Sequence, residues 1–212
     1  MKIKRGEGDR QLAHERRAMV LAALAGLYLP AKGVAASLPV TQEPWITLVR
    51  LLRQGQCALL LRHAVTEPGV GDPPQFTLGQ CHTQRNLSAQ GRQQSRALGE
   101  RMRALQLQPV RVLSSPWCRC VDTATLAFGS AQTWEPLGSF FTQREQGAAY
   151  AQSMREGLTR IPPGQFEVWV THMVNIEALT GQYAASGEGL IARIDRETAA
   201  GASVRVVGRW PV

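Results

Sequence analysis

The chain has 212 residues, of which 44% are hydrophobic and 19% are charged, a composition typical of a globular protein of about one domain. The formal net charge of +8 is shared equally between residues 1–36, with seven basic and three acidic residues, and residues 37–212, with 17 basic and 13 acidic residues. This mild excess, in a sequence with no aromatic-interleaved basic stripe and no helix-turn-helix pattern, argues against a nucleic-acid partner.

The first 36 residues predict a secretory signal. Basic residues extend to Arg17, the twelve residues 18–29 form an apolar core, and small residues precede a cleavage point after Ala36. Twelve apolar residues are fewer than the roughly 20 that span a bilayer, so we expect no stable membrane insertion after signal removal, with an uncleaved anchor as the alternative. Residues 37–212 would then form a single domain that is periplasmic or secreted.

A helix and a buried strand open this domain. Between Pro44 and Gly55, apolar residues recur at helical spacing on one face: Trp45, Leu48, Val49 and Leu52. The apolar run from Cys57 to Leu61 then predicts a strand buried in a parallel sheet. Residues 64–87 form a loop rich in Pro, Gly, Asp and Thr, and a loop of this length is usually functional.

Further strands and helices alternate along the rest of the chain. Ser88 is expected to cap a helix over 89–106, and a strand over 109–115 leads to a helix that runs from Arg119 to about Gly129. The expected remainder is irregular chain over 130–146, a helix over 147–160, a strand over 166–171, a short helix capped by Asn175 and ending at Gly181, and late, antiparallel edge strands over 188–194 and 202–207. This order indicates an α/β protein with a mainly parallel sheet.

Three of the expected strands are each followed by arginine or histidine. Arg62 and His63 follow the first strand, Arg119 comes soon after the second, and His172 follows the third. Open α/β sheets bind their ligands at the carboxyl ends of the strands, so these side chains are expected to meet there. Arginine and imidazole groups gathered at such an edge indicate a phosphate site.

The same segments resemble the motifs of the histidine phosphatase superfamily. The family's Arg-His-Gly motif corresponds to Arg62-His63-Ala64, and its Leu-Ser/Thr-x-x-Gly helix start corresponds to residues 87–91. Ser114-Ser115-Pro116, the following Arg119, the pair Thr123-Ala124 and His172 complete the resemblance, which runs from about Cys57 to Gly181. It implies a phosphoglycerate-mutase-like fold, a three-layer sandwich with a mainly parallel central sheet flanked by helices.

The resemblance also implies the catalytic roles. His63 would be the nucleophile that forms a phosphohistidine, and Arg62, Arg119 and His172 would hold the phosphoryl oxygens. A neutral imidazole can attack phosphorus in line, and guanidinium forks match the geometry of a phosphoryl group. No metal or other cofactor is expected, because the arginines neutralise the charge of the transferred group.

The proton donor does not follow from the resemblance. The two branches of the family place an acid where this chain has Met173 and Ser139. Asp72 is the preferred candidate, since Gly71-Asp72-Pro73-Pro74 would present it on a stiff turn, and Glu67 and Glu145 are alternatives. Substrate binding is expected from three residues of the long loop: Arg85, Asn86 and Glu67.

The four cysteines fit an oxidising compartment. A disulfide from Cys81 to either Cys118 or Cys120 would hold the long loop beside the pocket, whereas the Cys-x-Cys spacing argues against a zinc site. His82 is expected on the surface, and Trp117 and Trp169 in the core.

These features together predict an exported phosphatase that hydrolyses a phosphomonoester, with a small phosphorylated substrate that could be an envelope glycoconjugate. A phosphoglycerate-type mutase is one alternative. A phosphate-binding module with little turnover is another.

Overall fold

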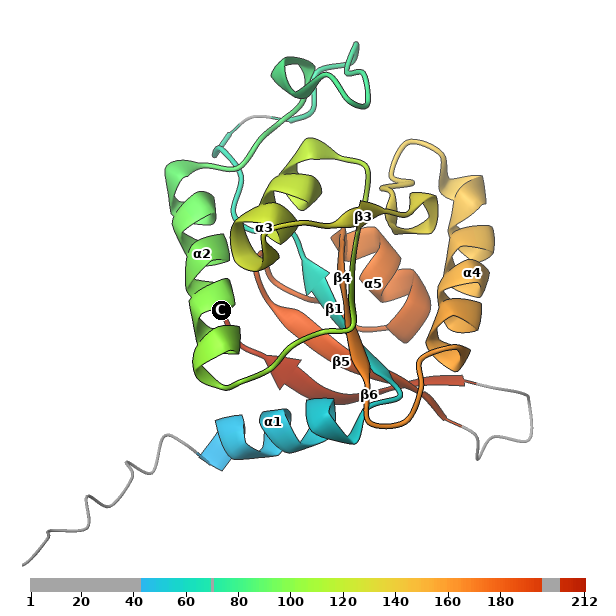
Figure 1. The fold of residues 1–212 in the computed structure, drawn as a ribbon. Helices are drawn as coiled ribbons and strands as arrows, with labels where there is room; N and C mark the ends of the chain where they lie inside the picture. Colours follow the sequence, from blue (N-terminus) through green and yellow to red (C-terminus); the bar gives the residue numbers. More distant parts are fainter. Residues whose placement is uncertain (1–42, 70, 196–202) are drawn as a thin grey trace, which may run out of the picture. The chain divides into compact units, whose positions relative to one another are not determined.

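The computed structural model describes residues 43–69, 71–195 and 203–212, so the predicted signal over 1–36 and its cleavage point lie outside the described residues. The helices are α1 (Glu43–Gln54), α2 (Ala89–Ala104), α3 (Cys118–Phe128), α4 (Gly147–Thr159) and α5 (Met173–Thr180). The strands are β1 (Cys57–Arg62), β2 (Arg111–Ser114), β3 (Gln132–Thr133), β4 (Phe166–Thr171), β5 (Gly189–Asp195) and β6 (Ser203–Trp210). Figure 1 shows their arrangement.

The described strands form one six-stranded sheet in the order β3-β2-β4-β1-β5-β6. The first four strands in this order are parallel, β5 pairs antiparallel with β1, and β6 pairs antiparallel with β5. The mainly parallel sheet is therefore confirmed. The expectation that both late strands are edges is wrong for β5, which lies between β1 and β6 and buries its first four residues.

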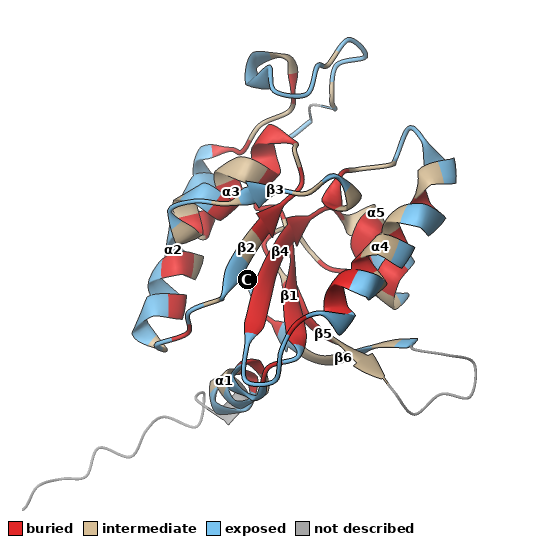
Figure 2. Ribbon diagram, turned by 45° about the vertical axis from the view of Figure 1, so that its right-hand side comes forward, coloured by how far each residue is buried: buried red, intermediate tan, exposed pale blue. Residues whose placement is uncertain are grey.

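Helices cover both faces of the sheet, which gives three layers. Cys57, Leu59 and Leu61 of β1 pack in one core with residues of α1, α2 and α3. Ala58 and Leu60, which point the other way, pack in a second core with α4 and α5. Figure 2 shows β1 and β4 as buried strands at the centre, with α2 and α3 on one side and α4 and α5 on the other.

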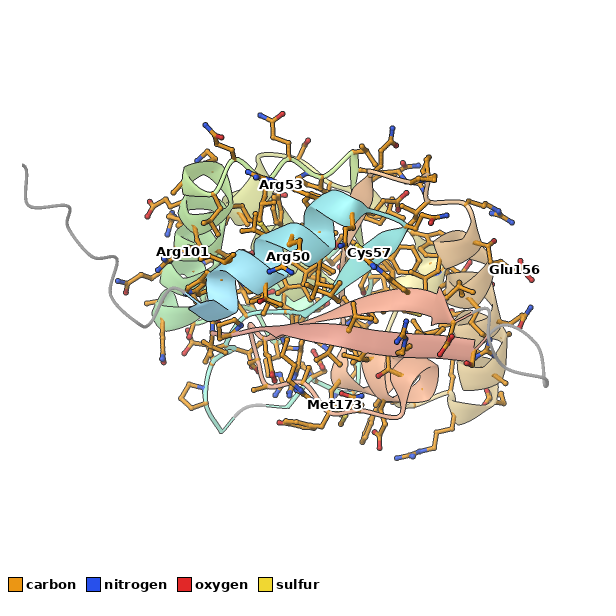
Figure 3. All side chains as sticks on the ribbon, turned by 90° about the horizontal axis from the view of Figure 1, so that it is seen from below. Arg50, Arg53, Cys57, Arg101, Glu156 and Met173 are labelled. Atoms are coloured by element: carbon orange, nitrogen blue, oxygen red, sulfur yellow. A yellow bond between two sulfur atoms is a disulfide. The ribbon has the colours of Figure 1, made fainter. Side chains whose placement is uncertain are left out.

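Helix α1 follows its expected pattern, with Leu48 and Leu52 buried and Gly55, at a φ of 73°, directly after its end. Figure 3 shows α1 from outside, with Arg50 and Arg53 on its exposed face. Within the described part of the chain, no helix is long and apolar enough to cross a membrane.

Two local expectations need correction. Helix α5 begins at Met173 with His172 as its N-cap, whereas Asn175 lies inside its first turn and donates to the carbonyl oxygens of Pro136 (3.1 Å) and Gly138 (2.7 Å). The stretch 130–146 also contains the two-residue strand β3, which pairs with the end of β2 and is too short to leave a pattern in the sequence.

Candidate active site

The carboxyl ends of β1, β4 and β2 lie side by side. Arg62 is paired with Thr171, and the amide of His63 donates to the carbonyl oxygen of Thr171 at 3.0 Å. The amide of Ser115 donates to the carbonyl of Val170 at 2.8 Å, which brings the end of β2 to the same edge. The ring centroids of His63 and His172 are consequently 5.4 Å apart, although the two residues are far apart in sequence.

A cavity of about 670 Å³ opens at this edge. Its lining includes all four residues expected around the phosphoryl group, namely Arg62, His63, Arg119 and His172. Asp72 and Arg85 also line the cavity. The other expected residues do not line it. Glu67 and Glu145 are exposed, and Asn86 is directed back into its own loop, where its Nδ2 donates to the carbonyl oxygen of Cys81 at 2.6 Å.

The histidine at the end of β1 is held in one tautomer. His63 is only 4% exposed, and its Nδ1 lies 2.9 Å from the carbonyl oxygen of Ala64. A carbonyl oxygen can only accept, so Nδ1 carries the proton and Nε2 keeps its lone pair. Burial lowers the pKa of His63 to about 3, and the charge of Arg119 acts in the same direction. The ring is therefore neutral at physiological pH.

His172 is the second buried imidazole of the site. Its Nε2 lies 2.8 Å from the hydroxyl of Ser115, and its Nδ1 lies 3.5 Å from Nη2 of Arg119. Burial lowers its pKa well below the usual value, with further lowering by His63 and Arg119. The thiol of Cys120 is 3.5 Å from the same Nε2, and burial raises the pKa of that thiol to about 12, so it is present as the neutral thiol.

Each of the two arginines is fixed by its own partners. Nη1 of Arg62 donates to the hydroxyl of Tyr183 at 3.1 Å and to the carbonyl of Ala184 at 2.9 Å. The guanidinium of Arg119 lies 4.5 Å from the ring of Trp117, and its Nη1 donates to Oδ1 of Asp72 at 2.9 Å. Both cations are thereby preorganised before any anion arrives.

The long loop is tied to the start of α3 next to Arg119. Cys81 forms a disulfide with Cys118, which confirms that Cys81 bridges one of the two cysteines that flank Arg119. The side chain of Gln84 accepts from the amide of Cys118 at 2.9 Å. Oδ1 of Asp72 also accepts from the amide of Arg85 at 3.0 Å, so the loop holds this carboxylate against Arg119. Cys57 and Cys120 are free and buried.

The remaining motif residues hold the backbone around His63. Ser88 caps α2 by accepting from the amide of Gly91, as expected. A Cβ on Gly91 would lie 1.9 Å from the carbonyl oxygen of Val65, so only glycine allows α2 to approach this segment. Thr123 accepts from the amide of Ala64 at 3.1 Å. Ala64 does not have a positive φ, so its backbone does not require the glycine usual in the family.

Several residues of the site were missed or misread from the sequence. Trp117 is buried, as expected, but it also lines the cavity, whereas Trp169 lies in the core. Ser115 carries no catalytic expectation in the sequence, although its position directly after a strand was a usable signal. Phe76 and Phe141 lie in irregular segments, where no periodicity marks them. In the described ranges, no group of three or more His, Cys, Asp or Glu is placed to hold a metal ion.

Comparisons with known proteins agree with this geometry. Residues 58–137 match the family model of the histidine phosphatase superfamily (branch 1). No curated protein matches the chain. Among solved structures, the mycobacterial glucosyl-3-phosphoglycerate phosphatase Rv2419c is 16% identical, with a TM-score of 0.51, 73% of this chain covered and 98% of that chain covered.

Two further structures have a similar fold. The product of the open reading frame Rv3214 from Mycobacterium tuberculosis is 19% identical, with a TM-score of 0.50 and coverage of 72% of this chain and 96% of that chain. YhfR from Bacillus stearothermophilus is 17% identical, with a TM-score of 0.50 and coverage of 72% and 95%. The matched segment carries His63 and Arg119, so this part of the chain is similar to histidine phosphatases, and the described chain as a whole has a phosphoglycerate-mutase-like fold.

Proposed function

We propose that this protein hydrolyses a phosphomonoester and that Nε2 of His63 is the nucleophile. The observation that carries the proposal is the hydrogen bond from Nδ1 to the carbonyl of Ala64, which leaves an unprotonated Nε2 in a cavity lined by arginines. Attack of Nε2 on phosphorus would form a P–N bond and break the P–O bond to the alcohol. Water would then cleave the phosphohistidine and release inorganic phosphate.

The positive charge of the cavity suits a phosphoryl group. Arg62, Arg85 and Arg119 all line it, and Asp72 is the single carboxylate in the lining of the described cavity. Nε of Arg62 and Nε of Arg119 are buried without a hydrogen-bond partner in the described part of the chain, a cost that an anionic ligand can offset. We propose that these cations stabilise the transferred group without a metal ion.

His172 lines the cavity and holds Arg119 beside the phosphoryl site. A guanidinium can only donate, so Nδ1 of His172 accepts from Nη2 of Arg119 at 3.5 Å and the ring proton resides on Nε2. Nε2 then donates to the hydroxyl oxygen of Ser115 at 2.8 Å. Ser115 would then be a positioning residue that selects the tautomer in which His172 accepts from Arg119.

Asp72 is the proposed proton donor to the leaving alcohol. It lines the cavity, whereas Glu67 and Glu145 do not. In the absence of substrate it is paired with Arg119, and a phosphoryl group that binds Arg119 would take over that contact. The released carboxyl group would then be free to face the leaving alcohol.

Export and the envelope substrate are also proposed. The leader-like sequence over 1–36 and the Cys81–Cys118 disulfide support a periplasmic or secreted protein, since such bridges persist in oxidising compartments. An envelope glycoconjugate would be within reach there. Determination of the mature N-terminus tests cleavage of the signal, and a mature chain that retains residues 1–36 would contradict cleavage. Non-reducing peptide mapping tests export, and four free thiols would contradict it.

Hydrolysis of p-nitrophenyl phosphate by the purified protein tests the reaction class. We expect turnover that persists in EDTA and is abolished in His63→Ala. Binding of inorganic phosphate without turnover would instead support a phosphate-binding module. Interconversion of phosphoglycerates without release of phosphate would support a mutase.

A further inference from the structure

The wall of the cavity differs in character from its floor. The floor consists of the histidines and arginines, whereas the wall is mostly apolar: Pro73, Pro74, Phe76, Phe141, Met173 and Val174. The long loop supplies the first three of these side chains, and segments on the other side of the opening supply the others. Apart from the two histidines and the indole of Trp117, the uncharged polar side chains in the lining of the described cavity are those of Ser139 and Thr142.

The apolar surface begins beside Arg119. The ring of Phe76 lies 4.4 Å from that of Trp117, which in turn lies against the guanidinium of Arg119. A substituent attached to a phosphoryl group at Arg119 would therefore meet aromatic surface first. The volume of about 670 Å³ is within the range of pockets that enclose a whole small ligand, so there is room for such a substituent.

Phe141 contributes to this wall but is covered by little of the protein. The residue is 62% exposed, and the guanidinium of Arg144 lies 5.3 Å from the centre of its ring. An apolar group in the cavity would cover part of this ring and gain from the removal of both surfaces from water. A sugar would gain less, because its hydroxyl groups would lose water and find few hydrogen-bond partners on this wall.

We infer that the substrate is a phosphomonoester whose group next to the phosphate is apolar, either an alkyl chain or an aromatic ring. This inference rests on the proposed phosphatase function and specifies its substrate class. It departs from the expected glycoconjugate at the atoms that adjoin the phosphate, where the wall favours hydrocarbon over a sugar ring.

A series of n-alkyl phosphates from ethyl to hexyl tests the inference. Their alcohols have nearly equal acidity, so differences in kcat/KM report contacts with the substituent. We expect kcat/KM to rise about three- to fourfold per methylene until the wall is covered. Glycerol 3-phosphate and glucose 6-phosphate should fall well below hexyl phosphate. 2-Phenylethyl phosphate compares an aromatic substituent with the alkyl chain.

Phe141→Ala should flatten the increase with chain length, so that its loss of kcat/KM relative to the wild type grows from ethyl to hexyl phosphate. Because Phe141 is exposed, its removal should not affect folding. Leu78→Ala is the matched control, since Leu78 is a 47% exposed apolar residue of the long loop that does not line the cavity. The inference would be overturned if kcat/KM does not rise with chain length, if glucose 6-phosphate is preferred to hexyl phosphate, or if Phe141→Ala leaves the rise of kcat/KM per methylene unchanged.

Binding of non-hydrolysable alkylphosphonates separates the two proposals. Their affinity, measured by calorimetry, should rise with chain length whether or not the protein is a phosphatase. If affinity rises but no ester is hydrolysed, the proposed function fails and the apolar preference stands. If esters are hydrolysed and affinity does not rise, the apolar preference fails and the proposed function stands.

Discussion

Replacement of Asp72 by asparagine removes the proposed proton donor and keeps the size of the side chain. An amide cannot protonate a departing alkoxide, so an alkyl phosphate should lose about 10²–10⁴-fold in kcat. p-Nitrophenolate leaves without protonation, so kcat for p-nitrophenyl phosphate should fall by less than about fivefold. Loss of a general acid should therefore lower kcat more for the alkyl phosphate than for p-nitrophenyl phosphate. A general loss of structure would lower kcat for both esters equally.

The same substitution should strengthen phosphate binding. Oδ1 of Asp72 lies 2.9 Å from Nη1 of Arg119, whose side chain is 4% exposed against 21% for Asp72. A hydrogen bond between charged groups contributes about 1.5–3 kcal/mol and a neutral one about 1 kcal/mol, so Arg119 should be easier to free by about 0.5–2 kcal/mol. Inorganic phosphate should then inhibit Asp72→Asn at about tenfold lower concentration.

Steady-state kinetics on the two esters, with inorganic phosphate as inhibitor, measure both effects. Glu67→Gln and Glu145→Gln are matched controls, since both carboxylates are exposed and neither lines the cavity. Both should behave like the wild type. An equal loss on the two esters in Asp72→Asn, or a larger loss in either control, would refute the role proposed for Asp72.

Three further predictions follow from contacts around the site. When the pH is lowered from 7 to 5, the unfolded state gains a proton on each histidine that the folded state keeps neutral, so the free energy of unfolding decreases. For His63, whose pKa is about 3 in the folded state and 6.5 in the unfolded state, the decrease is about 2 kcal/mol. Urea denaturation of His63→Gln should show that much less loss over this interval, and an unchanged loss would contradict the burial of a neutral ring. Ser115→Ala should lower kcat/KM about tenfold and change the tautomer of His172 in ¹⁵N NMR, whereas an unchanged tautomer would exclude the positioning role. Reduction of the Cys81–Cys118 disulfide, which joins residues 37 apart, should cost about 4 kcal/mol of stability, and the double serine variant should be insensitive to reductant.

The parts of the fold that were predictable share strong local patterns. β1 and β4 are buried on both faces, so each appears in the sequence as an apolar run, and the charged or polar residues that follow mark where the strands end. Because parallel strands end at one edge, the meeting of His63 with His172 followed from the pattern alone. Helices α1 and α4 were found because each buries a single face.

The remaining features depend on tertiary contacts that leave no periodic pattern. The alternation of apolar and polar residues in β5 did not show that this strand lies inside the sheet, because its position depends on β6 pairing with its other edge. The long loop indicated function by its length, but its sequence could not show that Asp72 turns to Arg119 while Glu67 turns to solvent. The contribution of Phe141 to the wall likewise depends on how two irregular segments face each other.

The most direct test of the proposed mechanism is capture of the phosphoenzyme. The protein is mixed rapidly with a radiolabelled phosphomonoester and quenched in alkali, and the labelled peptide is then identified. We predict an acid-labile label on His63 that forms and decays within the time of one turnover and is absent from His63→Ala. Label that is stable to acid, label on another residue, or turnover that survives in His63→Ala would contradict the mechanism.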